Sequence, residues 1–218
     1  MRNKTPAGAL SRMRPEPGFC AALRVSWSIA LGVALAAGWP AAQAQPLPAV
    51  AQVCAACHEA VGSARQPSMP SIAGQPKLFI ENQLVLIREG LRDVPAMKGL
   101  MEGLSDENIV ALARQYAAQT ALPPAGLLQP DKYRAGAEVS RQALCGTCHL
   151  PTYVGQNQVP RLAGQQEDYL VVTMKMYRDN PAPGRDTAMS AVLRGLQDAQ
   201  LANLAHYFAH FGSQGHPK

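Results

Sequence analysis

One five-residue string occurs twice in this chain, over Cys54–His58 (CAACH) and over Cys145–His149 (CGTCH). The pattern C-x-x-C-H is typical of covalent haem attachment. Two thiols three positions apart on one helical turn can each form a thioether with a vinyl group of the same porphyrin. The histidine that follows is then placed to bind the iron. The sequence therefore predicts two covalently bound haem c groups. The predicted attachment residues are Cys54, Cys57, Cys145 and Cys148, and the predicted proximal ligands are His58 and His149.

The first 44 residues have the three parts of a secretory signal peptide. A basic segment is followed by an apolar stretch over 25–38, and Ala42-Gln43-Ala44 is a small-x-small cleavage signature. We expect cleavage after Ala44 and export to the periplasm. An uncleaved N-terminal anchor is the alternative, although the apolar stretch is short for a bilayer, which needs roughly 20 residues.

Charge excludes one class of partner. The chain has 20 basic and 15 acidic residues, and the signal segment holds five of the basic ones and one acidic residue, Glu16. The remainder carries 15 against 14, so the basic face that a nucleic-acid partner requires is missing. Four of the five cysteines lie in the two C-x-x-C-H strings, and the fifth, Cys20, lies in the signal segment.

The chain also contains an internal repeat. Residues 70–75 (PSIAGQ) match residues 160–165 (PRLAGQ), and Met97 and Leu104 match Met189 and Leu196. The offsets agree with that of the haem strings to within one residue. This duplication predicts an N-terminal domain over 45–118, a proline-containing linker over 119–130 and a C-terminal domain over 131–218.

Each half is expected to be helical. We expect first helices over about 49–57 and 132–148, and second helices over about 77–89 and 166–178. Apolar residues at positions i, i+3, i+4 and i+7 predict third helices around 109–116 and 201–208, with Ser105 as a helix N-cap. No alternating strand pattern is present, so the predicted fold class is all-α. Domains this small need the haem as part of their interior.

Methionines are the candidates for the sixth iron ligand. With histidine opposite, a methionine thioether raises the reduction potential of a c-type haem. Met97 and Met189 hold equivalent places in the two repeats, on segments predicted to be loops, and we expect them to be the ligands. Met101 is the rival on the same segment as Met97. Packing is the expected role of three others, Met101, Met174 and Met176, while Met69 lies too near His58 in sequence to reach the opposite face.

For two further pairs of residues the sequence leaves two roles open, and for three histidines it predicts no role at the haem. Pro70 and Pro160 follow the haem strings, and each either offers a carbonyl oxygen to the proximal histidine or only forms a turn. Arg92 and Arg185 are either haem-propionate partners or solvated surface residues. Three histidines near the C-terminus are expected to be surface or terminal residues: His206, His210 and His216.

On these strings, prolines, Ala-Gly-Gln turns and methionines, the chain resembles the cytochrome c4 family of bacterial periplasmic dihaem cytochromes. The resemblance implies two class I cytochrome c domains with His58/Met97 and His149/Met189 as iron ligands. It also implies shuttling of electrons to terminal oxidases, and in some members peripheral association with the membrane. The partners expected are redox proteins: a membrane cytochrome complex, a terminal oxidase or a dehydrogenase.

The predicted function is therefore one-electron transfer between a respiratory donor and a terminal acceptor, without catalysis by this chain. Two alternatives differ in kind. The chain could be the electron-accepting cytochrome subunit of a periplasmic dehydrogenase, or a dihaem peroxidase, which would need an iron with an open sixth position. Zinc binding and dithiol exchange, the other uses of C-x-x-C, do not call for the adjacent histidine.

Overall fold

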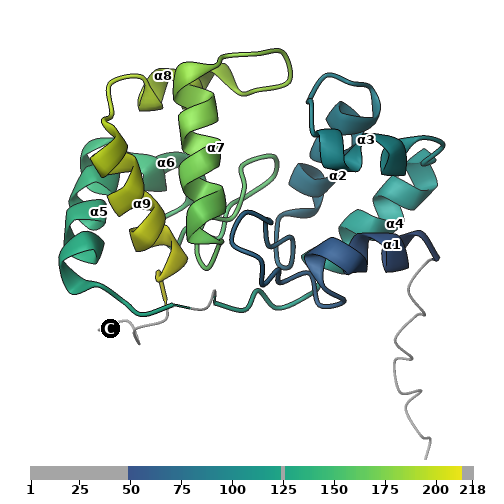
Figure 1. The fold of residues 1–218 in the computed structure, drawn as a ribbon, viewed down its shortest axis with the longest axis horizontal. Coiled ribbons are helices and arrows are strands. Elements are labelled where there is room, and N and C mark those ends of the chain that lie inside the picture. The colour runs from purple at the N-terminus through teal and green to yellow at the C-terminus, as the bar shows by residue number, and fades with distance from the viewer. Residues whose placement is uncertain (1–48, 124–125, 213–218) are drawn as a thin grey trace, which may run out of the picture. The chain divides into compact units, whose positions relative to one another are not determined.

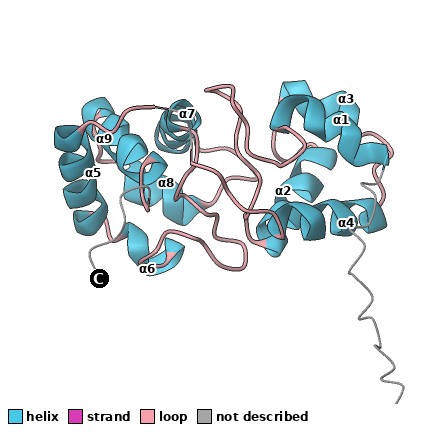
Figure 2. Cartoon of the chain, turned by 90° about the horizontal axis from the view of Figure 1, so that it is seen from below, coloured by secondary structure: helices cyan, strands magenta, loops and turns pink. Residues whose placement is uncertain are grey.

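The computed structural model describes residues 49–123 and 126–212, and the predicted signal peptide and its cleavage site lie outside these ranges. Within them the chain is helical (Figure 1), and the sole β-type pairing is an isolated bridge between Gln156 and Val159. Figure 2 shows loops, not strands, joining the helices. The all-α prediction is confirmed. The described helices are α1 (Ala49–His58), α2 (Lys77–Arg88), α3 (Pro95–Met101), α4 (Asp106–Ala117), α5 (Pro130–Gln142), α6 (Cys145–His149), α7 (Glu167–Asp179), α8 (Thr187–Leu193) and α9 (Asp198–Ala209).

In the first half, α4 supplies more of the buried core than any other helix. Its buried side chains recur at helical spacing and pack with residues of α2, and the hydroxyl of Ser105 caps its first turn by accepting the Asn108 N–H at 3.3 Å. The predicted stripe and the predicted cap are both confirmed. The buried core of this half consists of Ala51, Ile80, Ile87, Met101, Leu104, Ile109, Leu112, Ala113 and Tyr116.

In the second half, α5 and α9 approach unusually closely. A Cβ atom built on Gly136 of α5 would lie 2.1 Å from the carbonyl oxygen of Asn203 in α9, so only glycine fits there. Helix α9 also packs on α7, and aromatic side chains fill the space around it, with Tyr153 and Phe208 ring centres 5.0 Å apart. The buried core of this half consists of Val139, Tyr153, Ala163, Leu170, Met174, Leu193, Leu201, Leu204, Ala205, Tyr207 and Phe208.

The prediction of one continuous helix over about 132–148 is wrong. Helix α5 ends at Gln142, where the Ala143 N–H bonds back to the Val139 carbonyl oxygen. Leu144 then adopts a left-handed conformation (φ 54°) before α6 begins. Leucine rarely adopts this conformation, and no glycine or proline marks the break in the sequence.

The predicted loops that carry Met97 and Met189 are short helices instead, α3 and α8. Pro95 opens α3, where its missing N–H costs nothing, and the Asp186 side chain caps α8 by accepting the Met189 N–H at 3.0 Å. Both methionines are therefore held on a helical turn, which fixes their position better than an irregular loop would.

No helix in the described part of the chain combines the length and apolar character needed to cross a bilayer.

Candidate haem-binding sites

The two predicted proximal histidines occupy equivalent and buried positions. His58 is the last residue of α1 and His149 the last of α6, and their exposed fractions are 7 % and 4 %. Nδ1 of His58 lies 2.9 Å from the Pro70 carbonyl oxygen, and Nδ1 of His149 lies 2.8 Å from that of Pro160. The carbonyl-acceptor interpretation of both prolines is confirmed.

These hydrogen bonds fix the tautomer of both rings. A carbonyl oxygen can only accept, so Nδ1 carries the proton and Nε2 keeps the lone pair that a metal ion requires. Burial lowers the pKa of both His58 and His149, and the carbonyl contact offsets this in part. The lowered pKa favours the neutral form of both rings, which is the form that can bind a metal ion.

The loops that present the carbonyl groups are hydrogen-bonded to a residue four positions after each haem string. In the first half, the Gly62 carbonyl oxygen accepts the N–H groups of Ile72 and Ala73 at 2.7 and 2.9 Å. In the second half, the Tyr153 carbonyl oxygen does the same for Leu162 and Ala163 at 2.9 and 3.1 Å. The repeated loop is thus held by a repeated pair of backbone bonds.

Gly155 adds a close contact in the second half. It has a φ of +74°, and a Cβ atom there would lie 2.5 Å from the carbonyl carbon of Pro160. Any other residue at this position would push the acceptor loop away from His149.

The candidate thioether cysteines differ in exposure within each string. Cys57 and Cys148 are exposed, whereas Cys54 and Cys145 are half-buried and pack against the cores of their own halves. Burial raises the pKa of the half-buried thiols Cys54 and Cys145.

Each core also contacts one candidate axial methionine. Met97 packs against the same buried cluster as Cys54, and Met189 packs against the same cluster as Cys145. Each half therefore offers a neutral imidazole, a pair of thiols and a thioether at the edge of one apolar core. This donor set matches what haem c requires, which is covalent attachment, one histidine and one methionine.

The packing prediction holds for two of the other three methionines and fails for the third. Met101 and Met174 are 4 % and 6 % exposed and belong to the buried cores, so the packing prediction is confirmed for both. It is wrong for Met176, which is 39 % exposed because it points away from the α7 face that packs on α9.

The prediction of surface positions for His206 and His210 is also wrong, since they are 1 % and 7 % exposed. Nε2 of His206 accepts the backbone N–H of Gln129 at 2.9 Å, and its Nδ1 donates to the Glu167 carboxylate at 2.8 Å. His206 thus anchors the residue preceding α5 to the start of α7. His216 lies outside the described residues.

Within the described ranges, one group of three or more histidine, cysteine or acidic side chains has the spacing to hold a metal ion: Glu167, His206 and His210, whose potential ligand atoms lie within 4.8 Å of one another. Both ring nitrogens of His206 are already used in hydrogen bonds. We therefore interpret this group as a structural contact that joins α9 to Gln129 and to α7.

The two arginines considered as propionate partners are hydrogen-bonded within the protein. Arg92 donates to Gln83 and, at 3.4 Å, to the Tyr169 hydroxyl, while Arg185 donates to the Asn180 carbonyl oxygen. Both arginines are half-buried.

Sequence reasoning missed a second pair of arginines that the repeat also duplicates. Arg88 donates to the Leu104 carbonyl oxygen at 2.9 Å, and Arg178 donates to that of Leu196, also at 2.9 Å. Arg88 also pairs with Asp106, the first residue of α4, and Arg178 pairs with Asp198, the first residue of α9. These bonds tie α2 to the start of α4 and α7 to the start of α9.

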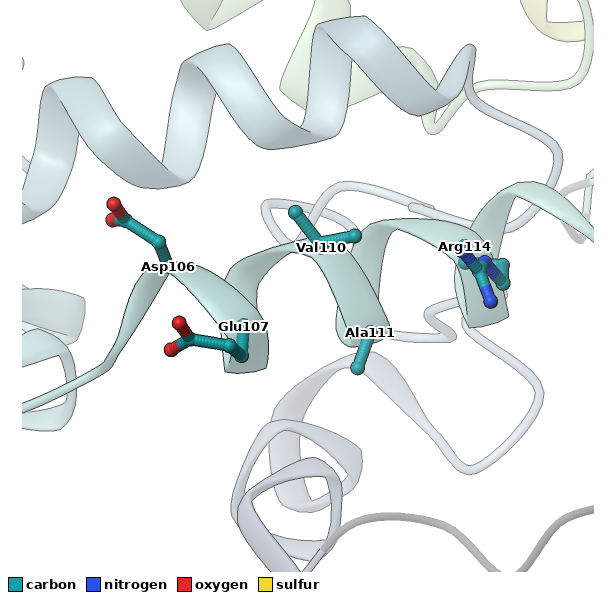
Figure 3. Close-up of a pocket in the computed structure, with 5 residues that line it drawn as sticks. All are labelled: Asp106, Glu107, Val110, Ala111 and Arg114. Atoms are coloured by element: carbon teal, nitrogen blue, oxygen red, sulfur yellow. The ribbon is translucent and has the colours of Figure 1, made fainter.

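A shallow depression of about 390 Å³ lies on α4 (Figure 3). Its lining includes none of the candidate haem residues and consists of Asp106, Glu107, Val110, Ala111 and Arg114. Because it opens widely to solvent and has one helix for a wall, it does not enclose a ligand.

Two family models match successive parts of the chain. Residues 41–114 match the family model "Cytochrome C oxidase, cbb3-type, subunit III", and residues 133–211 match the model "Cytochrome c". A tandem helical protein with two such matches and two haem strings is a dihaem c-type cytochrome.

The relatives narrow this class. The chain is 30 % identical to cytochrome c4 of Pseudomonas aeruginosa, over 81 % of this chain and 90 % of that one. It is 32 % identical to a thiosulfate dehydrogenase electron acceptor of Thiomonas intermedia, over 83 % of this chain and 86 % of that one. The crystal structure of reduced cytochrome c4 from Pseudomonas stutzeri superposes with a TM-score of 0.67 at 26 % identity, covering 73 % of this chain and 93 % of that one.

The chain belongs to the dihaem cytochrome c4 family. It is an electron-transfer protein with two covalently bound haem c groups and not an enzyme, so the peroxidase alternative is set aside. Its partners are redox proteins.

Proposed function

We propose that this protein is a periplasmic one-electron carrier whose two haems each have a closed, six-coordinate iron. The axial pairs are His58/Met97 and His149/Met189, and the thioethers form at Cys54, Cys57, Cys145 and Cys148. The domains are 45–118 and 131–218 with a linker over 119–130, and the mature chain begins after cleavage at Ala44. The observation that supports this most strongly is the duplicated hydrogen bond from a buried histidine to a proline carbonyl oxygen.

The protein's own residues limit what each site can do. When bound, haem c supplies an iron that changes by one electron between ferrous and ferric states. The proline carbonyl groups hold the imidazole rings in one orientation. Met97 and Met189 would hold the iron through their thioethers and so deny a small molecule access to it. The apolar cores exclude water from the buried side, so little has to rearrange when the charge changes.

The choice of methionine can be tested by potentiometric titration of the holoprotein. Met97→His should lower the potential of one haem, because imidazole stabilises ferric iron better than a thioether does. Met101→Leu is the matched control on the same helix, since its buried side chain already packs in the core. An unchanged potential in Met97→His together with a lowered one in Met101→Leu would show that the ligand assignment is wrong.

For the partners, we propose a terminal oxidase as the acceptor. The family assignment supports this choice. The test mixes ferrous holoprotein with membranes of the source organism and follows haem oxidation by stopped-flow absorbance. Fast oxidation that cyanide abolishes is expected, and ferrous protein that stays reduced in oxygenated membranes would exclude an oxidase partner.

The second candidate is service as the electron acceptor of a dehydrogenase. It is favoured by the similarity to the thiosulfate dehydrogenase electron acceptor of Thiomonas intermedia. Ferric holoprotein mixed with purified thiosulfate dehydrogenase and thiosulfate should then be reduced at a rate that rises with dehydrogenase concentration. Reduction no faster than with thiosulfate alone would exclude this role.

A further inference from the structure

The glutamine that ends each Ala-Gly-Gln string reaches into the opposite half of the molecule. Gln165 Oε1 accepts the Ser71 N–H at 2.7 Å, and its Nε2 donates to the Ser71 carbonyl oxygen at 2.8 Å. Gln75 makes the same pair of bonds with Arg161, at 2.9 Å to the N–H and 3.0 Å to the carbonyl oxygen. Both glutamines are buried, with exposed fractions of 4 % for Gln75 and 5 % for Gln165. Each of these two glutamines thus makes the same pair of backbone hydrogen bonds with the other half.

Ser71 and Arg161, the residues that the glutamines contact, each follow a proline that is hydrogen-bonded to a predicted proximal histidine. Ser71 follows Pro70, so the Ser71 N–H and the Pro70 carbonyl belong to one peptide group. That carbonyl oxygen accepts a hydrogen bond from Nδ1 of His58. Arg161 follows Pro160, and the carbonyl oxygen of their shared peptide group accepts a hydrogen bond from Nδ1 of His149. An unbroken hydrogen-bonded chain therefore runs from each proximal imidazole, through one peptide group, to a glutamine of the other half.

Hydrogen bonds in such a chain polarise one another. When a peptide N–H donates to a good acceptor, the carbonyl oxygen of the same peptide group becomes a stronger acceptor, by about 10–30 % per bond. A stronger acceptor at Nδ1 makes the imidazole a better electron donor to its metal ion and fixes the ring orientation. Greater donation favours ferric over ferrous iron.

We propose that each domain tunes the haem of the other: Gln165 lowers the potential of the N-terminal haem, and Gln75 that of the C-terminal haem. The glutamines are positioning residues, because they act on the iron through a peptide group and an imidazole and do not touch the haem. The inference rests on the proposed roles of His58 and His149 as proximal ligands.

A purely structural role is the competing explanation, because bonds between the halves also hold them together. A neighbouring residue, Gln166, allows the tuning role and the structural role to be distinguished. Gln166 is 7 % exposed and its Nε2 also crosses to the other half, where it donates to the Ala64 carbonyl oxygen. Ala64 is not part of a peptide group that binds a proximal histidine. Gln166→Leu is therefore the matched control for Gln165→Leu.

The experiment is a redox titration of the holoprotein in which each haem is followed by its own resolved methyl signals in the NMR spectrum. Met97→His and Met189→His assign the two sets of signals, since each perturbs one haem. Gln165→Leu should reduce the ferric-to-ferrous ratio of the N-terminal haem, at fixed ambient potential, by about two- to threefold. At 59 mV per tenfold change this corresponds to an upward shift of about 18–28 mV.

Gln75→Leu should produce the corresponding shift at the C-terminal haem, and Gln166→Leu should shift neither haem. If Gln165→Leu does not fold, Gln75→Leu makes the same test, because Gln75 has no bond in this network beyond those to Arg161. Amide exchange gives a second readout, with faster exchange expected at Ser71 in Gln165→Leu and at Arg161 in Gln75→Leu.

A shift at the haem of the mutated domain, equal shifts in the control, or no shift at all would overturn the proposal. These results differ from a failure of the ligand assignment itself. In that case Met97→His and Met189→His would leave the potential of both haems unchanged, whatever the glutamine variants do.

Discussion

Replacing Gly136 with alanine should destabilise the C-terminal half, although alanine is the better helix former. The added Cβ would lie 2.1 Å from the Asn203 carbonyl oxygen and 2.6 Å from the Tyr207 Cβ, so α5 and α9 must separate. Overpacking of this kind costs about 1–3 kcal/mol. We expect the upper end, because the obstructing atom belongs to a helix backbone.

The gain from helix propensity is about 1 kcal/mol, which leaves a net loss of about 1–2 kcal/mol. For a domain of this size that loss corresponds to a fall of roughly 4–16 °C in the thermal midpoint. The measurement is circular dichroism of the ferric holoprotein during heating and in urea.

Gly99→Ala is the control, because a Cβ on Gly99 in helix α3 would have no atom within 4 Å. It should be neutral or stabilising by up to about 1 kcal/mol. A Gly136→Ala protein at least as stable as the unmutated one would refute the packing argument.

Three other substitutions test the local structure. His206→Leu should cost about 1–3 kcal/mol and speed amide exchange at Gln129, whose N–H loses its acceptor; unchanged exchange would contradict the anchor role. Ser105→Ala should cost about 1 kcal/mol in urea unfolding by removing the cap of α4, and a cost near zero would count against the cap. Arg178 lowers the pKa of the Asp179 carboxyl through a hydrogen bond, so this pair stabilises the fold above the ordinary pKa of about 4 and loses its effect as pH falls further. The stability difference between Arg178→Met and the unmutated protein should therefore shrink from pH 7 to pH 3, and a constant difference would contradict the linkage.

Short-range patterns were enough to predict the elements that pack as amphipathic helices. The stripe from Ile109 to Tyr116, its repeat in α9 and the Ser105 cap are properties of adjacent residues, and the structure bears them out. The haem strings could be recognised because covalent attachment requires C-x-x-C-H at a fixed spacing. For Pro70 and Pro160 the sequence left the carbonyl acceptor and the simple turn open, and the structure decides for the acceptor.

The failures have a different origin. The break between α5 and α6 depends on a left-handed leucine, which tertiary contacts impose against its local preference. The burial of His206 could not be foreseen because its partners, Gln129 and Glu167, are distant in sequence.

The hydrogen bonds of Gln75 and Gln165 to the opposite half were predictable only in part. The repeat marked Gln75 and Gln165 as equivalent, but their partners lie 86 and 94 residues away in the other half. Periodicity within one helix or loop contains no information on such a pairing. A repeated polar residue without a local role was the one signal available.

The most direct test of the proposed coordination is the weak near-infrared band that a methionine sulfur–iron bond gives the ferric holoprotein. We expect the band in the unmutated protein, about half its intensity in Met97→His and in Met189→His, and none in the double variant, because one such bond is lost per substitution. A band that persists in the double variant, or that is absent from the unmutated protein, would contradict the coordination of the two haems by Met97 and Met189.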